Sequence, residues 1–455
     1  MKITLGYDLL THNGFIPNCL DPKFLETIRE ASDYDYGNCR DYFIKKWGCD
    51  YSVFNGHDLD SISIKKSVFN IIEDRKKGIN YKWFYIIEPH SGFDLFFGNH
   101  PLHNKFLLEF ISKNALNEII NNNGHLLINY VIDGGLGITK KNFDKIINFT
   151  RTNNIPDEKV YLIFSDFKLK ENFKKLNVNY NVLDHNFYLK FKSHEFNKII
   201  KEGDNNKSTI ASKNDFIEKI NSDKKDFLLL TRHFKLHRIA LLSQLHKLGI
   251  NNSLVSWEKT YYNHSVVKQL LKFDNNDEFI ELIKNTSKTI DVDDLTNIMG
   301  IGFENKDMYL DTYLSIVTES IFFQDDINFP SGFLSEKIWK PIGHCQPFIL
   351  AGPSRSLNYI KERYGFKTFH PFIDETYDTV DDDYERLNLI KNEIIKFSQK
   401  TKEEKKEFLN NVKDICFFNQ ELFLKINKNS FGEIKPNEDY DRSLKFLIND
   451  INHII

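Results

Sequence analysis

The stretch FLSEKIWKPIGHCQPFILAGPSRSLNYIKERYGFKTF, residues 333–369, places a helix, a buried strand and a second helix in close succession. Ser335 can act as the N-cap of a short amphipathic helix, and we expect Pro341 to end or kink that helix early. The apolar run PFILAG at 347–352 follows as a strand, and the turn GPSRS opens the next helix from Ser354. This order is typical of an α/β protein in which helices cover a parallel sheet.

Similar alternation extends over the rest of the chain. Short apolar runs end in acidic or polar residues and are separated by helical stretches such as 102–122 and 235–249. Parallel strands gather their C-terminal residues at one edge of a sheet, where ligands bind. We therefore expect mainly parallel sheets with helices on both faces and strands at 83–89, 125–133, 159–166, 177–185, 226–231, 252–257, 313–320, 347–352 and 366–369.

Chain length and one polar interruption predict the domain organisation. The 455 residues exceed what one ordinary core accommodates, and the chain between about 200 and 225 is polar with few large apolar side chains. We expect two facing Rossmann-like domains with a ligand between them. The predicted parts are an N-terminal domain at 1–205, a linker at 206–225, a C-terminal domain at 226–430, and a C-terminal helix at 431–455 that packs back on the N-terminal domain.

Composition narrows the class of protein. Apolar residues make up 41% of the chain and the net charge is −3, which describes a soluble globular protein with no overall field for nucleic acid. The 40 Phe and 20 Tyr fall at core periodicities without a basic stripe, so nucleic-acid binding is not expected. The five cysteines are scattered and odd in number, which indicates a reducing compartment. The sequence shows neither a signal peptide nor an apolar run long enough to span a membrane, so a cytoplasmic location is predicted.

A basic turn follows the apolar run at 226–231. Its sequence, TRHFKLHR, contains Arg232 and His233 after the strand, then His237 and Arg238 in the first turn of a helix. Backbone N–H groups at a helix N-terminus attract anions, and cations added there suit a pyrophosphate rather than the helix itself. The alternative interpretation is a solvated basic turn.

The helix that begins after Ser335 presents a second group of candidate binding residues. Glu336 is suited to accept both hydroxyls of a ribose, while Lys337 and Lys340 can reach phosphate as point charges. The turn GPSRS that follows the next strand is another place where an anion could bind. The alternative here is an ordinary surface ion pair between Glu336 and Lys340.

These motifs resemble, in kind and order, the C-terminal nucleotide-sugar domain of GT-B glycosyltransferases of viruses and bacteria, most nearly the α1,3-fucosyltransferase-like family. The resemblance covers roughly residues 226–390 and departs from the family at GHCQPF, where a small-residue run is usual. In that family a Ser/Thr-Glu-Lys motif contacts the donor. The resemblance implies that Glu336 binds ribose and Lys337 binds phosphate, with Arg232 or Arg238 assisting, and that Thr318 and Glu319 of IVTES lie in the cleft.

The resemblance also implies a reaction. An inverting, metal-independent enzyme would move a sugar from a GDP- or UDP-linked donor, bound as substrate and with no cofactor, to a glycan or glycoconjugate hydroxyl. A carboxylate or histidine of the N-terminal domain would deprotonate that hydroxyl. The first candidate is Glu88 in YIIEPHS, and the others are His90, Asp133, Asp184 and His185. If the source is viral, the location is the host cytoplasm.

Two competing functions remain open at this point. A metal-dependent GT-A glycosyltransferase would hold a divalent ion on paired aspartates, and the acidic runs at 291–294 and 381–383 have the required residues. Acidic runs are usually solvated loops, however. The other alternative is a non-catalytic binding or structural protein that retains the GT-B shell.

Overall fold

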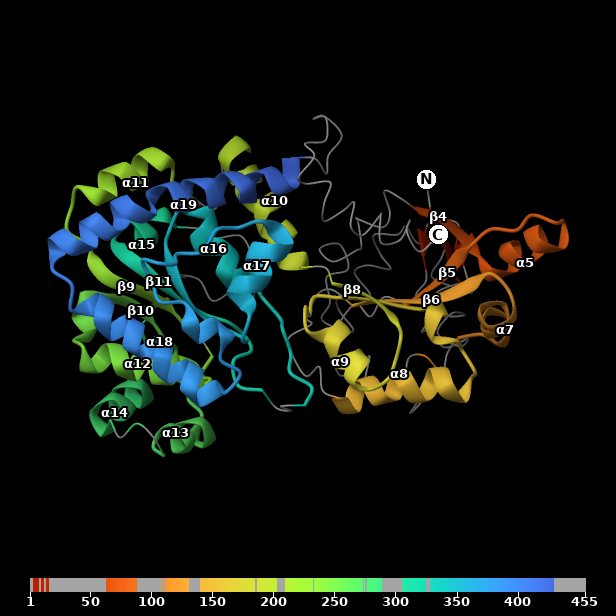
Figure 1. Cartoon of the computed structure of the whole chain (residues 1–455), viewed down its shortest axis with the longest axis horizontal. Coiled ribbons are helices and arrows are strands. Elements are labelled where there is room, and N and C mark those ends of the chain that lie inside the picture. The colour runs from red at the N-terminus through yellow and green to blue at the C-terminus, as the bar shows by residue number, and fades with distance from the viewer. Residues whose placement is uncertain are drawn as a thin grey trace. The chain divides into compact units, whose positions relative to one another are not determined.

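The structure is a computed structural model, and two compact units make up the chain (Figure 1). Of the described residues, unit 1 takes those up to Asn186 together with 328–331, and unit 2 takes those from 187 to 324 together with 332–428. No helix among the residues described is long and apolar enough to cross a membrane. The residues described are 3–7, 10–11, 14–15, 63–87, 108, 111–130, 140–184, 186–202, 209–231, 233–272, 274, 276–288, 305–324 and 328–428.

Unit 1 is built on a parallel sheet with the strand order β4-β1-β5-β6-β7-β8 in its described part. The strands predicted at 83–89, 125–133, 159–166 and 177–185 are confirmed, and β4 was not predicted. The strands are β1 (Ile3–Tyr7), β4 (Ser63–Ser67), β5 (Trp83–Ile87), β6 (Gly124–Tyr130), β7 (Val160–Phe164) and β8 (Asn181–Asp184). The helices are α5 (Val68–Lys76), α7 (Lys113–Asn121), α8 (Lys140–Thr152) and α9 (Leu169–Lys175), and β2 (Leu10–Thr11) pairs with β3 (Gly14–Phe15).

One apolar cluster joins the four described helices of unit 1 to its sheet. It takes alternate residues of β5, β6 and β7, which is the pattern expected when one face of each strand is covered. Phe143 of α8 and Phe173 of α9 pack edge to face within it, with ring centroids 5.1 Å apart.

A short segment from much later in the chain completes this core. Phe329 is buried and lies 5.4 Å from the Phe143 ring, centroid to centroid. Asn172 Nδ2 donates to the carbonyl oxygen of Pro330 at 2.8 Å, and Ser331 Oγ donates to Asp166 Oδ2 at 2.7 Å. Unit 1 is therefore discontinuous in sequence, which the amino-acid pattern did not indicate.

Unit 2 has a second parallel sheet with the described order β10-β9-β11-β12. Its strands are β9 (Lys225–Leu230), β10 (Ser253–Ser256), β11 (Thr312–Thr318) and β12 (Phe348–Ala351), and all four confirm the prediction. The strand expected at 366–369 is absent from this described region. Its backbone is bound instead by Asn419, whose Oδ1 accepts from Lys367 N and whose Nδ2 donates to Lys367 O, each at 2.8 Å.

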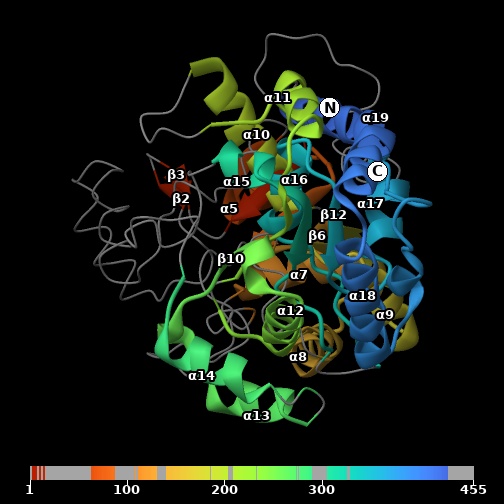
Figure 2. The ribbon, with the colours of Figure 1, turned by 90° about the vertical axis from the view of Figure 1, so that its left-hand side faces the viewer.

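Helices cover both faces of the unit 2 sheet, as Figures 1 and 2 show. α12 (Leu236–Lys247) and α18 (Asp383–Ser398) lie on one face, and α16 (Glu336–Gly343) and α19 (Lys402–Lys428) lie on the other. With the sheet between them these layers form an α/β unit, and the two units are compatible with a Rossmann-like fold. The other helices are α10 (Phe187–Glu202), α11 (Lys213–Ile220), α13 (His264–Leu270), α14 (Asp277–Asn285), α15 (Lys306–Leu310) and α17 (Ser356–Tyr364).

The boundary between the units differs from the predicted one. α10 was expected in the N-terminal domain, but it belongs to unit 2 because it packs against α16 and α19. Ser193 Oγ donates to Phe423 O of α19 at 2.6 Å. The predicted linker at 206–225 contains α11, whose Phe216 is buried against Phe417 of α19. The predicted C-terminal helix at 431–455 lies outside the described residues.

We predict that Phe329→Ala destabilises unit 1 by about 3–5 kcal/mol, because it removes a buried aromatic ring from the cluster around Phe143 and Phe173. Hydrogen exchange should show lost protection in α8 and α9 but not in α18. Phe69→Ala is the matched control, since Phe69 is 68% exposed. An equal effect of the two substitutions would contradict the assignment of Phe329 to this core.

Candidate functional site

The order of the unit 2 strands identifies where a ligand would bind. The chain leaves β9 through α12 to reach β10 on one side, and it later returns to β11 on the other side. The point where the strand order reverses therefore lies between β9 and β11. In parallel α/β sheets, ligands bind beyond the carboxyl ends of the strands at such a point. β9 ends at Leu230 and β11 at Thr318, so the turns that follow these two residues form the candidate site.

Glu319 directly follows β11 and organises this site. Its side chain is 0% exposed. Glu319 Oε2 accepts hydrogen bonds from Ser335 Oγ at 2.6 Å, Ser335 N at 3.0 Å and Ser320 N at 3.3 Å. Gly352, after β12, leaves the room that this carboxylate needs, since a Cβ there would lie 3.3 Å from Glu319 Cγ. Burial raises the pKa of Glu319, because a charged carboxylate is costly away from water.

Ser335 is the N-cap of α16, as the sequence predicted. Its backbone is extended, and its Oγ accepts from Lys337 N. Pro341 does not stop the helix, which continues to Gly343 before Cys345 takes a left-handed conformation and Gln346 N bonds to Pro341 O. The cap and its bonds to Glu319 therefore fix the start of α16 at the carboxyl edge of the sheet.

Glu336 and Lys337 form an ion pair at this helix start. Lys337 Nζ lies 2.8 Å from Glu336 Oε1, 3.2 Å from Ser335 Oγ and 3.4 Å from Ser320 Oγ. The two side chains are 21% and 28% exposed, so both reach solvent. Burial opposes ionisation of Glu336, but the charge and hydrogen bond of Lys337, helped by Lys340, outweigh it and lower the pKa of Glu336 to about 2. Glu336 is therefore a carboxylate at neutral pH.

His237 and Arg238 are buried rather than solvated, whereas His233 of the same turn is exposed. Arg238 donates to Glu319 O at 3.1 Å, to Thr318 O at 3.4 Å and to His233 O at 3.4 Å. His237 Nε2 lies 3.0 Å from Glu319 O and must carry the proton, because a carbonyl oxygen only accepts. Both residues tie the first turn of α12 to the end of β11.

His237 and Arg238 differ in charge at neutral pH. Burial lowers the pKa of His237 well below its usual value, and Arg238 adds to this effect. The imidazole is neutral at pH 7 and stacks on Phe322, with ring centroids 5.1 Å apart. Burial also lowers the pKa of Arg238, to about 10, against the opposing charges of Glu319 and Glu336. The guanidinium therefore remains a buried cation at neutral pH.

Three buried polar atoms of the site have no hydrogen-bond partner within the described part of the chain. They are Arg238 Nε, Thr318 Oγ1 and Glu319 Oε1. Buried polar groups in folded proteins are nearly always satisfied by protein, water or a bound molecule. Thr318 and Glu319 lie at the end of β11, and Arg238 donates to the carbonyl oxygens of both.

Sequence reasoning missed Lys235 and Ser320. Lys235 is the N-cap residue of α12, and its Nζ donates to Ser320 O. The hydroxyl group of Ser320 also accepts a hydrogen bond from Lys337 Nζ. Lys235 lies inside the quoted motif TRHFKLHR, and its position directly before the first helical turn was the available signal.

The remaining predicted residues fall into two groups. Glu88, His90, Asp133, His185 and Arg232 lie outside the described residues, as does the acidic run 291–294. In unit 1, Asp184 is half-buried and ends β8.

The acidic run 381–383 supports local structure. Asp382 caps α18 by accepting from Glu385 N at 2.8 Å, Asp381 accepts from Ser354 Oγ at 2.7 Å, and Asp383 pairs with Arg386. Within the described ranges, no three His, Cys, Asp or Glu side chains are grouped so that they could hold a metal ion.

The turn GPSRS was expected to attract an anion, and the protein supplies that anion itself. Asp378 Oδ1 accepts from Leu357 N at 3.0 Å and Oδ2 accepts from Asn358 N at 3.1 Å. These amides are the first of α17, so the carboxylate occupies the place where an external anion would bind. This helix start is therefore not a second ligand site.

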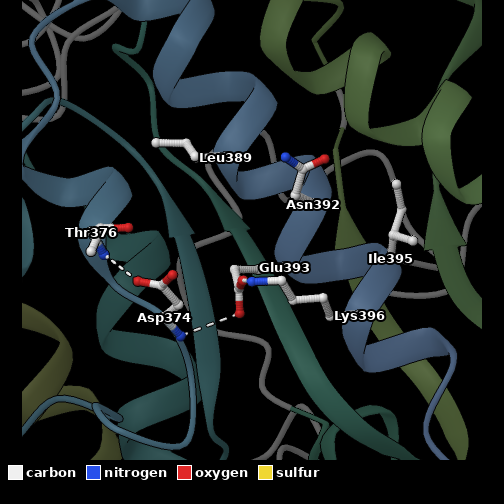
Figure 3. A pocket seen from close by; sticks show the side chains of 7 residues that line it. All are labelled: Asp374, Thr376, Leu389, Asn392, Glu393, Ile395 and Lys396. Carbon is white, nitrogen blue, oxygen red and sulfur yellow. Dashed lines mark hydrogen bonds and ion pairs between the residues drawn. The ribbon is translucent and has the colours of Figure 1, made fainter.

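A separate pocket of about 300 Å³ lies in unit 2 and is shown in Figure 3. Its polar groups already pair with one another. Glu393 accepts from Asp374 N and Lys396 Nζ, and Asp374 accepts from Thr376 N. The pocket thus offers few unmet polar contacts, in contrast to the end of β11. It is lined by Asp374, Thr376, Leu389, Asn392, Glu393, Ile395 and Lys396.

Comparison of the chain with protein-family models, curated proteins and solved structures finds no match in any of the three.

We predict that Glu319→Gln and Glu336→Gln change the pH dependence of stability in opposite ways. The raised pKa of Glu319 means that its contribution is present below the ordinary carboxyl pKa and is lost as the pH rises through the raised value. Glu319→Gln should therefore gain stability relative to the wild type as the pH rises.

For Glu336 the contribution to stability changes with pH in the opposite direction. Its contribution is present above the ordinary pKa of 4.5 and is lost as the pH falls towards about 2. Glu336→Gln should cost up to about 3 kcal/mol at neutral pH and less as the pH falls below 4.5. Urea unfolding at several pH values measures both effects, with exposed Glu362→Gln as the control. Stability differences that change in the same direction with pH for both variants would contradict this assignment.

Proposed function

We propose that this chain is a glycosyltransferase of GT-B type, in which unit 2 binds a nucleotide-sugar and a group of unit 1 activates a hydroxyl of a glycan acceptor. The observation that carries the proposal is the start of α16. There Ser335, Glu336 and Lys337 are fixed by buried Glu319 at the carboxyl edge of a parallel sheet, next to the reversal of strand order. The resemblance to the fucosyltransferase-like family assigns the donor motif to these same residues, which supports the proposal.

The charges of this site suit a nucleoside diphosphate. Glu336 is ionised and 21% exposed, and a carboxylate can accept hydrogen bonds from both hydroxyls of a ribose. Lys337 is close enough to Glu336 to bind phosphate beside that ribose. As the bond between sugar and diphosphate breaks, negative charge grows on the diphosphate, and cations already in place stabilise it. This role requires no metal ion.

The acceptor would be activated from unit 1. The strand order of unit 1 reverses between β1 and β5, and β5 ends at Ile87, directly before Glu88 in the chain. A residue that follows a strand at such a reversal is well placed to act on a ligand. Glu88 is therefore the proposed general base, and His90 and Asp133 are the other candidates. Removal of the acceptor proton as its oxygen attacks the sugar from the opposite side would invert the anomeric configuration.

Nucleotide binding tests the donor site. We expect GDP or UDP, or their sugars, to stabilise the protein by about 2.7 kcal/mol at a concentration 100 times Kd, with or without EDTA. Glu336→Ala and Lys337→Met should remove most of this stabilisation. The matched controls are Glu362→Ala and Lys361→Met, whose side chains are exposed on α17. No thermal shift with GDP, UDP, CMP or their sugars at about millimolar concentration would favour the non-catalytic alternative instead.

Transfer kinetics test the base. Glu88→Gln should lower kcat by about 10²- to 10⁴-fold, because a general base contributes rate enhancements of that size. Nucleotide affinity should stay within a factor of two or so of the wild type, since the donor is bound by unit 2. A variant that retains full kcat would show that the base is another residue, and His90→Gln and Asp133→Asn are the next variants to measure.

A further inference from the structure

The chain between Glu319 and Ser335 leaves unit 2, enters unit 1 and returns. Its outgoing limb is 319–324, its tip in unit 1 is 328–331, and its returning limb is 332–335. The two ends of this loop are held together, because Ser335 N and Oγ donate to Glu319 Oε2 at 3.0 and 2.6 Å. The base of the loop therefore belongs to the candidate site of unit 2, while its tip belongs to unit 1.

The tip of the loop is fixed by side chains of unit 1. The Phe329 ring is buried in the aromatic cluster of α8 and α9. Next to it, Pro330 O accepts from Asn172 Nδ2 at 2.8 Å, and Ser331 Oγ donates to Asp166 Oδ2 at 2.7 Å. A buried ring with a hydrogen bond on each of the two residues after it fixes the tip relative to α9.

The outgoing limb is fixed within unit 2. Phe322 is buried, with the His237 ring stacked on it at a centroid distance of 5.1 Å and the Arg386 guanidinium 4.5 Å from its ring centroid. Arg386 also donates to Phe322 O at 2.9 Å, and Asp383 Oδ2 accepts from Gln324 N at 2.8 Å. This limb is therefore anchored to α12 and α18 before the chain leaves the unit.

The returning limb is short and buried. Only the three residues 332–334 separate Ser331 of unit 1 from Ser335 of unit 2. All three are buried, and the Phe333 ring packs edge to face against Tyr188 of α10 with centroids 5.9 Å apart. Close-packed protein interiors have few voids and transmit strain, so a displacement at one end of this limb reaches the other end.

We propose that the returning limb couples the core of unit 1 to the candidate site, so that Phe329 is a positioning residue for the first turn of α16. With the tip held by Phe329, Ser335 stays in hydrogen-bonding position for Glu319. Glu336 and Lys337 follow Ser335 directly and keep the positions that this cap gives them. Loosening of either end would loosen the other, because coupling between two sites is reciprocal. The coupling does not depend on the proposed function, whereas its effect on nucleotide binding does.

Hydrogen exchange of the full chain tests the coupling from unit 1 to unit 2. Phe329→Ala should speed exchange of the amides at 335–340 by about fivefold or more, since couplings between sites commonly reach this size. Phe329→Leu keeps an apolar side chain at the tip and should restore most of the protection. If Phe329→Ala fails to fold, Ser331→Ala removes the hydrogen bond to Asp166, keeps the aromatic cluster and gives the same comparison.

Ile119→Ala is the matched control for these variants. It truncates a fully buried residue of the same apolar cluster, but on α7 and outside the loop. Exchange at 335–340 should stay within about twofold of the wild type, because distant sites without shared partners act independently.

The reverse direction is tested by Ser335→Ala, which removes the Oγ bond to Glu319. This variant should speed exchange in α9, whose Asn172 binds the loop at Pro330, by about fivefold or more. Ser212→Ala is its matched control, because Ser212 is the N-cap of α11 in the same unit and lies outside the loop. The control should leave exchange in α9 within about twofold of the wild type.

Nucleotide titration separates this inference from the proposed function. If unit 2 binds GDP or UDP, Phe329→Ala should weaken that binding by about fivefold or more and Ile119→Ala by less than about twofold. Reciprocal exchange effects in a protein that binds neither nucleotide would support the inference and count against the glycosyltransferase. Exchange effects confined to the substituted unit in both directions would overturn the inference, whether or not nucleotide binds. Equal effects of the control variants on the other unit would also overturn it, because they would indicate general destabilisation.

Discussion

The hydrogen bonds between Glu319 and Ser335 are the interaction on which the candidate site depends. A fully buried carboxyl group is costly to remove from water, and three donors to one of its oxygens offset that cost. They join the end of β11 to the beginning of α16. Without them the backbone of Ser335 would lose its fixed position, and Glu336 and Lys337 would no longer face the same point as the first turn of α12.

The opposite end of α16 is fixed just as firmly. Gly343 allows close approach of α10, since a Cβ at this position would lie 2.2 Å from a ring carbon of Phe196. His344 stacks on Tyr309 and accepts from Ala211 N at 3.2 Å, and Gln346 binds the buried amine of Lys219. The sequence GHCQPF thus forms specific contacts with α10, α11 and α15. It is also the place where the chain departs from the family pattern that its other motifs resemble. A helix held at both ends can present its first turn with little freedom of movement.

Much of this architecture could be predicted from local patterns. Apolar runs located most of the strands, because strands buried on both faces are continuous in hydrophobicity. Ser335 located the start of α16 because capping depends on neighbouring residues only. The features that were missed depend on distant partners. The segment 366–369 begins and ends with Phe and was predicted as a strand, yet Asn419 binds the backbone N–H and carbonyl oxygen of Lys367. The Lys235 side chain is positioned by its hydrogen bond to Ser320 O. Helix α10 belongs to unit 2 because it packs against α16 and α19.

The discontinuity of unit 1 has a consequence for biosynthesis. Phe329 belongs to the core around Phe143, but the ribosome must first translate Phe187–Gln324 of unit 2. At about 5–20 residues per second, this interval lasts roughly seven to thirty seconds. During that time Phe143 and Phe173 lack one of their native partners on the nascent chain. Unit 1 therefore cannot complete its core until Phe329 has been translated.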